Sequence, residues 1–167
     1  MSNTLLIDFK NKKNNMAREL YVEKTVIIGK PIEKVFDFLK LMENQNEFSV
    51  WVMKDLNKKS TLQGTDGTVG YIISWRGNKK AGEGEKELMN IIDGKRIETE
   101  IRFVKPMRVT ASVIMETEPL SDTQTKVYLI NAGTMKYPMN IFIPIAEKRF
   151  PRDMDESLVT LKNIFEK

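Results

Sequence analysis

The alternation of apolar and polar residues predicts an antiparallel sheet over the middle of the chain. Residues 96–103 place Ile97, Ile101 and Phe103 on one face and charged side chains on the other, and residues 109–115 alternate in the same way. A strand with one apolar and one charged face is typical of an antiparallel sheet that is wet on one side. We expect six strands in this part of the chain, at 50–57, 68–76, 84–92, 95–104, 107–118 and 125–134.

The two ends of the chain predict a different arrangement. Residues 20–29 are rich in β-branched side chains and predict a first strand. Pro31 fits the first turn of a helix, and a second short helix or turn follows at 42–48. From Phe150 to Phe165 apolar residues recur three or four positions apart, which predicts a long terminal helix with Pro151 in its first turn or at a kink.

A length of 167 residues suits one domain with one core. Residues 1–19 are polar and rich in Asn and Lys, so we expect a flexible N-terminal extension followed by a single domain over 20–167. Met16 stands just before the first strand, which leaves open whether translation starts at Met1 or Met16.

The composition excludes several kinds of site. The chain has no cysteine and no histidine. Disulfides, thiolate sites, conventional zinc sites and triads with an imidazole base are therefore excluded. Any catalysis has to use carboxylates, Lys, Tyr, Arg or backbone groups. We expect no metal, no cofactor and no catalytic residue.

The charge does not indicate a nucleic-acid partner. The net charge is +4, and the basic residues are dispersed and interleaved with Glu. A dispersed excess of this size is typical of a solvated surface. The chain has no apolar run long enough to span a bilayer and no signal-peptide pattern, so we expect a cytoplasmic protein without integral membrane association.

The most pointed motif is SWRGNKKAGEGE at 74–85, which combines glycines with carboxylates. A dinucleotide fingerprint needs three glycines between a strand and a helix. Here Gly82 and Gly84 are followed by Glu87 and by a strand. GTDGTVG at 64–70 lacks the Gly-Lys-Ser/Thr of a phosphate loop. These glycines therefore predict turns and bulges in a curved sheet.

Glu83, Glu85 and Glu87 alternate and share one strand face. They could form a catalytic pair, but carboxylates in this pattern more often line a solvated face opposite Lys and Arg. We predict the solvated face.

Several segments together resemble the SRPBCC superfamily, the START-like or birch-pollen-allergen-like helix-grip proteins, and within it the bacterial polyketide cyclase/dehydrase and lipid-transport group. The resemblance runs from about Tyr21 to Lys167. Its marks are IIGKPIEKVFDFL, GTDGTVGYIISWRGNKKAGEGE, FVKPM and RDMDESLVTLKNI. It implies an α+β fold in which a curved seven-stranded antiparallel sheet grips the C-terminal helix around a cavity, with two short helices after strand 1. It also implies that SWRGNKKAGEGE is the hairpin between strands 3 and 4, with Trp75 at its base.

The inward faces of the strands and the stripe of the last helix supply candidate ligand-binding residues. For most of them, ordinary core packing is the competing interpretation. Asn131 stands out because a buried amide needs partners, and Tyr71 and Trp75 could place a polar atom at a cavity wall. The candidates are Tyr71, Ile73, Trp75, Ile101, Phe103, Val113, Met115, Leu129, Asn131, Met154, Leu158 and Leu161. Residues just before the last helix, where the family often opens its cavity, are lid candidates: Tyr137, Met139 and Phe142.

Three functions remain open. The first is the binding or transport of a small hydrophobic ligand between sheet and helix. The second is a metal-independent cyclase or dehydratase that uses Tyr, Asn or Arg in the same cavity, although the absence of His removes the commonest general base. The third is a protein-interaction module without a ligand. The fold does not choose among these functions, and the sequence defines neither the ligand nor the oligomeric state.

Overall fold

The structure, a computed structural model, describes residues 17–52 and 57–167. Seven strands form one antiparallel sheet in the order β1-β7-β6-β5-β4-β3-β2. Consecutive strands pair as hairpins from β2 to β7, and β1 closes the meander by pairing with β7. The strands are β1 (Arg18–Ile28), β2 (Lys59–Gln63), β3 (Ile72–Arg76), β4 (Glu83–Ile92), β5 (Arg96–Lys105), β6 (Val109–Ser121) and β7 (Gln124–Met135).

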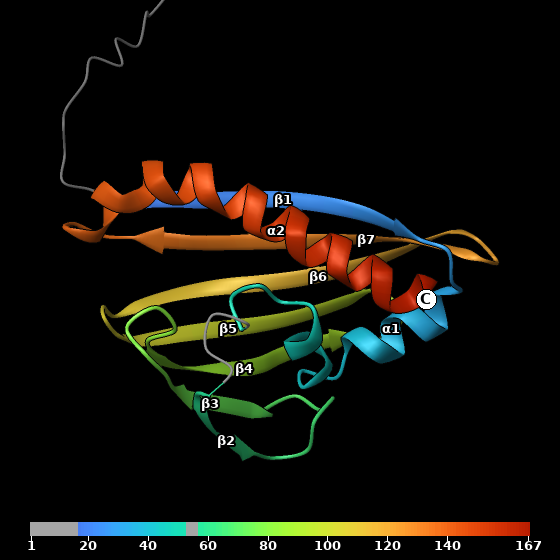
Figure 1. Cartoon of the computed structure of the whole chain (residues 1–167), viewed down its shortest axis with the longest axis horizontal. Helices are drawn as coiled ribbons and strands as arrows, with labels where there is room; N and C mark the ends of the chain where they lie inside the picture. The colour runs from blue at the N-terminus through green and yellow to red at the C-terminus, as the bar shows by residue number, and fades with distance from the viewer. Residues whose placement is uncertain (1–16, 53–56) are drawn as a thin grey trace, which may run out of the picture.

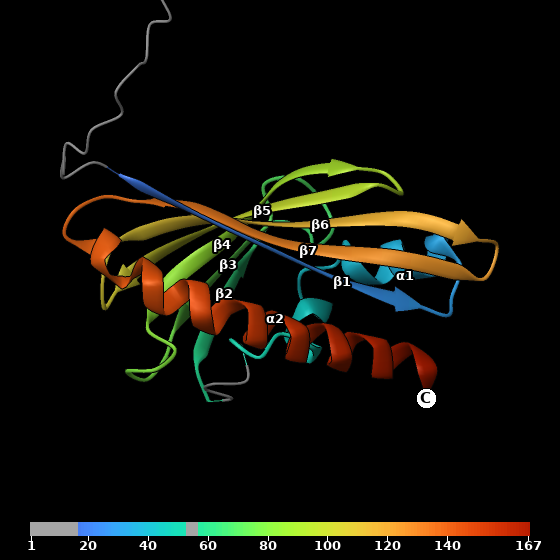
Figure 2. The same cartoon turned by 90° about the horizontal axis from the view of Figure 1, so that it is seen from above.

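Two helices cover one side of this sheet. The chain between β1 and β2 forms α1 (Ile32–Leu39) and the short 3₁₀ turn η1 (Asn44–Glu47), and the chain after β7 forms η2 (Met139–Phe142) and α2 (Ile143–Glu166). Figure 1 shows α2 running obliquely along β1 and β7 until its C-terminal end lies beside α1, and Figure 2 shows the sheet curling around the side that holds both helices. The expected α+β helix-grip architecture is confirmed.

The strand expected at 50–57 was wrong. Trp51 and Val52 lie in a turn, residues 53–56 lie outside the described residues, and the second strand is β2 instead. The apolar residues at 50–52 serve the packing of α2. The Val50 N–H donates to Ser157 Oγ over 3.2 Å, and the Trp51 ring meets the Phe150 ring edge-on at 5.8 Å.

Two element starts also differ from expectation. β3 begins at Ile72 rather than near residue 68, because Gly67 and Gly70 take positive φ angles of 76° and 88° in the preceding turn. α2 begins at Ile143 rather than near 150, with Pro151 inside it. Ile143 and Ala146 are buried against Leu20 of β1, so tertiary packing extends the helix ahead of Pro151.

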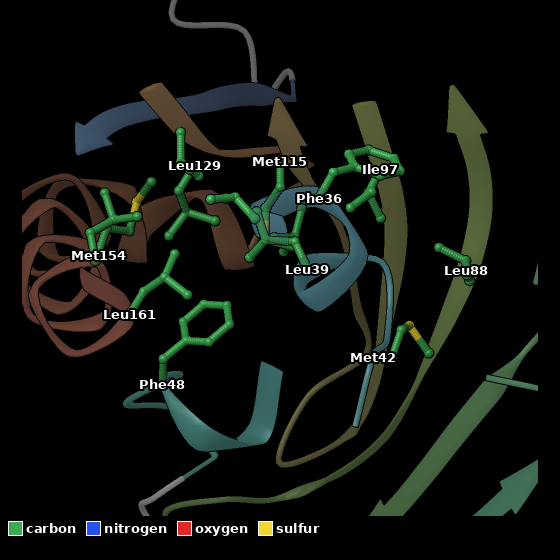
Figure 3. Packing of buried hydrophobic residues seen from close by; sticks show 14 of the residues in the cluster. Phe36, Leu39, Met42, Phe48, Leu88, Ile97, Met115, Leu129, Met154 and Leu161 are labelled. Carbon is green, nitrogen blue, oxygen red and sulfur yellow. The ribbon is translucent and has the colours of Figure 1, made fainter. Parts of the chain in front are cut away.

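The main core fills the space between the sheet and the helices. Figure 3 shows side chains from α1, the sheet and α2 converging there, together with Phe48, which follows η1. Leu39 of α1, Ile97 of β5 and Leu161 of α2 have no exposed surface. Aromatic rings join the ends of the two helices, since Phe38 lies 5.2 Å from Phe165 in an edge-on pair.

The glycine-rich motif is the hairpin between β3 and β4, as the sequence predicted. Gly82 has a φ of 66°, and a Cβ there would lie 2.3 Å from the Lys105 carbonyl oxygen. At Gly84 the pairing with β5 shifts register, and a Cβ would lie 2.6 Å from the Arg102 carbonyl oxygen. The glycines therefore allow the β3–β4 hairpin to pack closely on β5.

The proposed extension, residues 1–19, falls mostly on residues 1–16, which lie outside the described residues. Arg18 and Glu19 belong to β1. The division into an extension and a domain over 20–167 stays a prediction.

Candidate functional site

Cross-strand pairing defines which side chains share the concave face of the sheet. Trp75, Gly84, Phe103 and Val109 are paired in one row across β3 to β6. The next row contains Ile73, Lys86, Ile101, Ala111 and Gly133. Directly paired residues project to the same side of a sheet, so each row forms a continuous strip of the concave face.

Burial divides this face into two parts. The closed half is packed under α1 and the C-terminal part of α2, and its side chains are buried: Leu88, Ile97, Thr99, Val113, Met115, Val127 and Leu129. The open half lies toward the β3–β4 and β5–β6 hairpins and is only half-buried: Trp75, Lys86, Ile101, Phe103, Val109 and Ala111. The difference arises because α2 packs mainly on β1, and among residues 17–52 and 57–167 no helix covers the middle strands at that end.

The predicted site residues divide along the same line. Those of the closed half and of α2 belong to one core cluster: Tyr71, Ile73, Val113, Met115, Leu129, Met154, Leu158 and Leu161. Trp75, Ile101 and Phe103 lie in the open half, where the Trp75 and Phe103 rings meet edge-on with centroids 5.7 Å apart. The structure thus brings three of the candidates to a partly exposed apolar surface and uses most of the others as core.

The polar atoms of Tyr71 and Trp75 already have partners within the protein. Tyr71 Oη donates to Glu43 Oε1 over 2.8 Å, and Trp75 Nε1 donates to the Ala81 carbonyl over 3.1 Å. Burial and the bond to Glu43 raise the pKa of Tyr71 above its ordinary value. The two residues contribute apolar surface and rigidity, and the Trp75 bond ties the indole to its own hairpin.

Asn131 is the polar candidate whose bonding is incomplete. It lies on β7, paired with Val113 of the closed half and two residues from Gly133, the partner of Ala111. Its side chain is 6% exposed, and its Nδ2 has no hydrogen-bond partner. A buried amide donor without a partner costs about 1–3 kcal/mol, so this atom is available to an acceptor that enters the concave face.

Lys86 is the site residue that the sequence interpretation missed. It is half-buried on the concave face, and its Nζ donates to Oε1 of the buried Gln45. Gln45 Nε2 in turn donates to the Leu39 carbonyl over 3.1 Å. The pKa of Lys86 is lowered to about 8, first by burial and then by the charge of Lys58, against the opposing charge of Asp66. The signal was present in the sequence, because outward Glu85 and Glu87 place the residue between them inward.

The glutamates of β4 lie on the convex face, as predicted. Arg102 of β5 binds three carboxylates there, with N···O distances of 2.6 Å to Glu85, 2.5 Å to Glu87 and 2.6 Å to Glu100. These bonds, the one to Glu87 first, raise the pKa of the Arg102 guanidinium. The carboxylates are paired with a cation on the face opposite the open half.

The lid candidates lie on the chain that leads from β7 into α2. Tyr137 is 59% exposed and Phe142 is largely exposed, whereas the side chain of Met139 lies outside the described part of the structure. Ile141 and Ile145 beside them are also exposed. The segment therefore exposes apolar side chains where the chain enters α2, and its action as a lid stays a prediction.

Two hollows lie along α2, away from the concave face. One of about 710 Å³ is lined by Pro144, Ile145, Lys148, Arg149, Arg152, Asp153 and Glu156. The other, of about 580 Å³, lies at the C-terminal end and is lined by Glu47, Thr160, Asn163, Ile164, Glu166 and Lys167. Five of the seven residues that line the larger hollow are charged, and so are three of the six that line the smaller one.

Within residues 17–52 and 57–167, Asp and Glu do not gather in threes in a way that could hold a metal ion. None of the helices described there has the length and apolar character needed to cross a bilayer.

Comparisons with known proteins inform the fold. No family model matches the chain, and no curated protein matches it in sequence. Norcoclaurine synthase from Thalictrum flavum, solved in complex with dopamine and hydroxybenzaldehyde, superposes with a TM-score of 0.67 at 11% identity, over 99% of this chain and 98% of that one. The Aha1 protein of Colwellia psychrerythraea, solved as a dimer, gives 0.59 at 16% identity over 88% and 96%.

A protein of Chromobacterium violaceum gives a TM-score of 0.62 at 13% identity, over 88% of this chain and 97% of that one. Identities this low establish the fold alone. They confirm the helix-grip fold that the sequence resemblance implied.

Proposed function

We propose that this chain, which has the helix-grip fold of the SRPBCC superfamily, binds a small hydrophobic ligand on the open half of its concave face. The observation that carries the proposal is the half-buried apolar surface around Trp75, Ile101 and Phe103. Half-buried apolar side chains on a concave surface favour an apolar occupant, because each Å² of apolar area removed from water contributes about 25 cal/mol.

Asn131 adds a polar requirement to this ligand. Its unpaired Nδ2 belongs to the row of Val113 in the closed half, and the next row, that of Ala111, belongs to the open half. A ligand with a carbonyl, hydroxyl or carboxylate oxygen can accept from this donor, and its apolar body then lies toward Trp75. A small apolar molecule with one oxygen function therefore fits this surface better than a pure hydrocarbon.

The structural neighbours support a small-molecule role without specifying it. Norcoclaurine synthase holds dopamine and hydroxybenzaldehyde in its structure, so the same fold accommodates aromatic ligands in that protein. We further propose that the protein carries a lipid or a polyketide and that it is located in the cytoplasm.

The test uses the emission of Trp75 with decanol as a neutral apolar probe. Replacing Trp51 by Phe leaves Trp75 as the single indole. We expect decanol to change the emission in a saturable way. Ala111→Phe, which fills the open half, is expected to abolish the change, whereas Ser112→Phe on the convex face leaves it intact. Equal binding to both variants, or no binding of decanol, contradicts the proposal and moves the protein-interaction module to first place.

A second candidate is catalysis on the same ligand, and Lys86 favours it. A cyclase or dehydratase needs a group that exchanges protons near neutral pH. The lowered pKa of Lys86 meets that requirement without His. Turnover of a bound carbonyl compound that is lost in Lys86→Met, with binding retained, tests this candidate.

A further inference from the structure

Lys86 lies on β4, a strand whose convex face carries glutamates. Its own side chain projects to the concave face, into a row of apolar residues. Its paired neighbour on β3 is Ile73, and its paired neighbour on β5 is Ile101. A lysine in such a row loses part of the hydration of its ammonium. This loss is unfavourable unless strong hydrogen-bond or ionic partners replace the water. The partner that the structure provides is a neutral amide, that of Gln45.

The chain around η1 fixes the amine in place. Asp66, in the turn before β3, accepts from the backbone N–H groups of Met42 at 2.7 Å and Glu43 at 3.0 Å. This anchors η1 to the sheet, and the bond from Gln45 to the Leu39 carbonyl orients the Gln45 amide. The Lys86 amine is therefore positioned by a rigid support rather than left on a free four-carbon stem.

We propose that Lys86 forms a reversible imine with an aldehyde or ketone ligand whose apolar body occupies the open half. This inference rests on the proposed binding function and names its ligand class. The neutral Nζ attacks the carbonyl carbon, the N–C bond forms, and the carbonyl oxygen takes up a proton to give a carbinolamine. Loss of that oxygen as water gives the imine, so amine and carbonyl are converted to imine and water without an oxidant or reductant.

The charge state of Lys86 supports this chemistry. With a pKa of about 8, about a fifth of the amine is neutral at pH 7.4, compared with about a thousandth for an ordinary lysine. Only the neutral amine is a nucleophile, and desolvation in an apolar site is a recognised way to activate one. The apolar neighbours Ile73 and Ile101 also limit the water that would hydrolyse the imine.

A carbonyl suits the site better than a carboxylate. A carboxylate ligand would bind the charged ammonium, whereas imine formation uses the neutral amine, whose share burial increases. The carboxylate of Asp66 acts on the same amine, and it disfavours a second negative charge beside Lys86.

Reductive trapping tests the inference. The full chain is incubated with decanal and cyanoborohydride, and the product is measured by intact mass and peptide mapping. We expect one decyl group per chain, placed on Lys86. Lys86→Met and Lys86→Arg are expected to lose this group. Lys105→Met is the matched control, because Lys105 lies at the exposed end of β5 and its loss leaves the labelling unchanged.

The comparison of decanal with decanol distinguishes failure of imine formation from failure of binding. Decanol has the same chain without a carbonyl, so its binding reports on the open half alone. Binding of decanol without labelling of Lys86 by decanal overturns the imine and leaves the binding function standing. Labelling spread over exposed lysines at equal rates also overturns it. Reduced labelling of Lys86 by decanal in the presence of decanol supports both imine formation and binding to the open half.

Discussion

Trp75 and Phe103 meet edge to face across Gly84, the residue that pairs with both of them. The two rings lie on neighbouring sides of β4, and no side chain separates them. A Cβ on Gly84 would lie 2.9 Å from the Trp75 ring. The two rings of the open half can therefore meet because β4, the strand between them, carries a glycine at this position.

Gly84→Ala is expected to destabilise the protein by about 1–3 kcal/mol, because the added methyl meets both the Trp75 ring and the Arg102 carbonyl. Urea unfolding measures the loss, and the emission of Trp75 is expected to shift with it. Gly29→Ala is the control, since a Cβ there meets only Glu166 Oε1 at 3.8 Å. Equal stability of the two variants would show that the ring pair yields without strain.

Leu158→Ala is expected to cost about 2–5 kcal/mol, because Leu158 is 3% exposed in the core between α2 and the sheet. Val159 on the same helix is largely exposed, so Val159→Ala serves as a control and is expected to change stability by about 0.5 kcal/mol or less. Thermal and urea unfolding both measure the difference. A small loss at Leu158 would mean that the closed half is not packed.

Asn131→Leu is expected to stabilise the protein by about 1 kcal/mol and to weaken binding of ligands with an oxygen function. The variant removes a buried donor that has no partner. Chemical unfolding and ligand titration, made on the same samples, test both effects. Asn90→Leu on the exposed side of β4 is the control and leaves binding unchanged. A loss of stability in Asn131→Leu would indicate that the amide is satisfied in solution.

Lys86→Met is expected to be more stable than the parent chain below pH 8, and this advantage is expected to shrink between pH 8 and 10.5. The folded state holds the pKa of Lys86 near 8, below the ordinary 10.5, so the unfolded chain binds the extra proton over that range and parent stability rises with pH. The full effect corresponds to about 3 kcal/mol, reduced by the Gln45 oxygen that Met leaves unpaired.

Urea unfolding of both chains across this pH range checks the prediction. The charged groups that act on Lys86, Lys58 and Asp66, are common to both chains, as is the raised pKa of Tyr71. The titrations of these groups themselves occur in both chains, whereas their interaction with Lys86 exists only in the parent chain and is part of the measured difference. A difference that does not vary with pH would show that Lys86 titrates as an exposed lysine.

A chain that begins at Met16 is expected to melt within a few degrees of the full chain. The first strand begins at Arg18, and its first buried apolar residue is Leu20. Differential scanning calorimetry of both chains tests this expectation. A much lower melting temperature for the shorter chain would show that residues 1–15 dock on the domain.

The sequence predicted the sheet well because its signal is local. The alternation around Ile97 and Ile101 defines the faces of β5 without knowledge of any neighbour, and the same alternation placed Asn131 inward. The prediction of a strand at 50–57 failed because Trp51, despite its strand propensity, lies in a turn, where its ring packs on the distant Phe150.

The site was less predictable for a related reason. Which inward residues are core and which are half-buried depends on where α2 crosses the sheet, and this is a tertiary property. Ile101 and Val113 have equivalent patterns in sequence, yet Val113 is buried and Ile101 is half-buried. Lys86 was predictable from its place between Glu85 and Glu87. Its support by Gln45 was not, because η1 approaches from a distant part of the chain.

The division of the concave face leaves one of its ends packed and the other half-buried. In the described part of the chain, the packed end is the layer around Ile97 and Met115, and the half-buried end is the layer around Trp75 and Phe103. Under the proposed binding function, a ligand would enter and leave by the same half-buried end, because the opposite end is packed. Two ligands would then exchange one after the other.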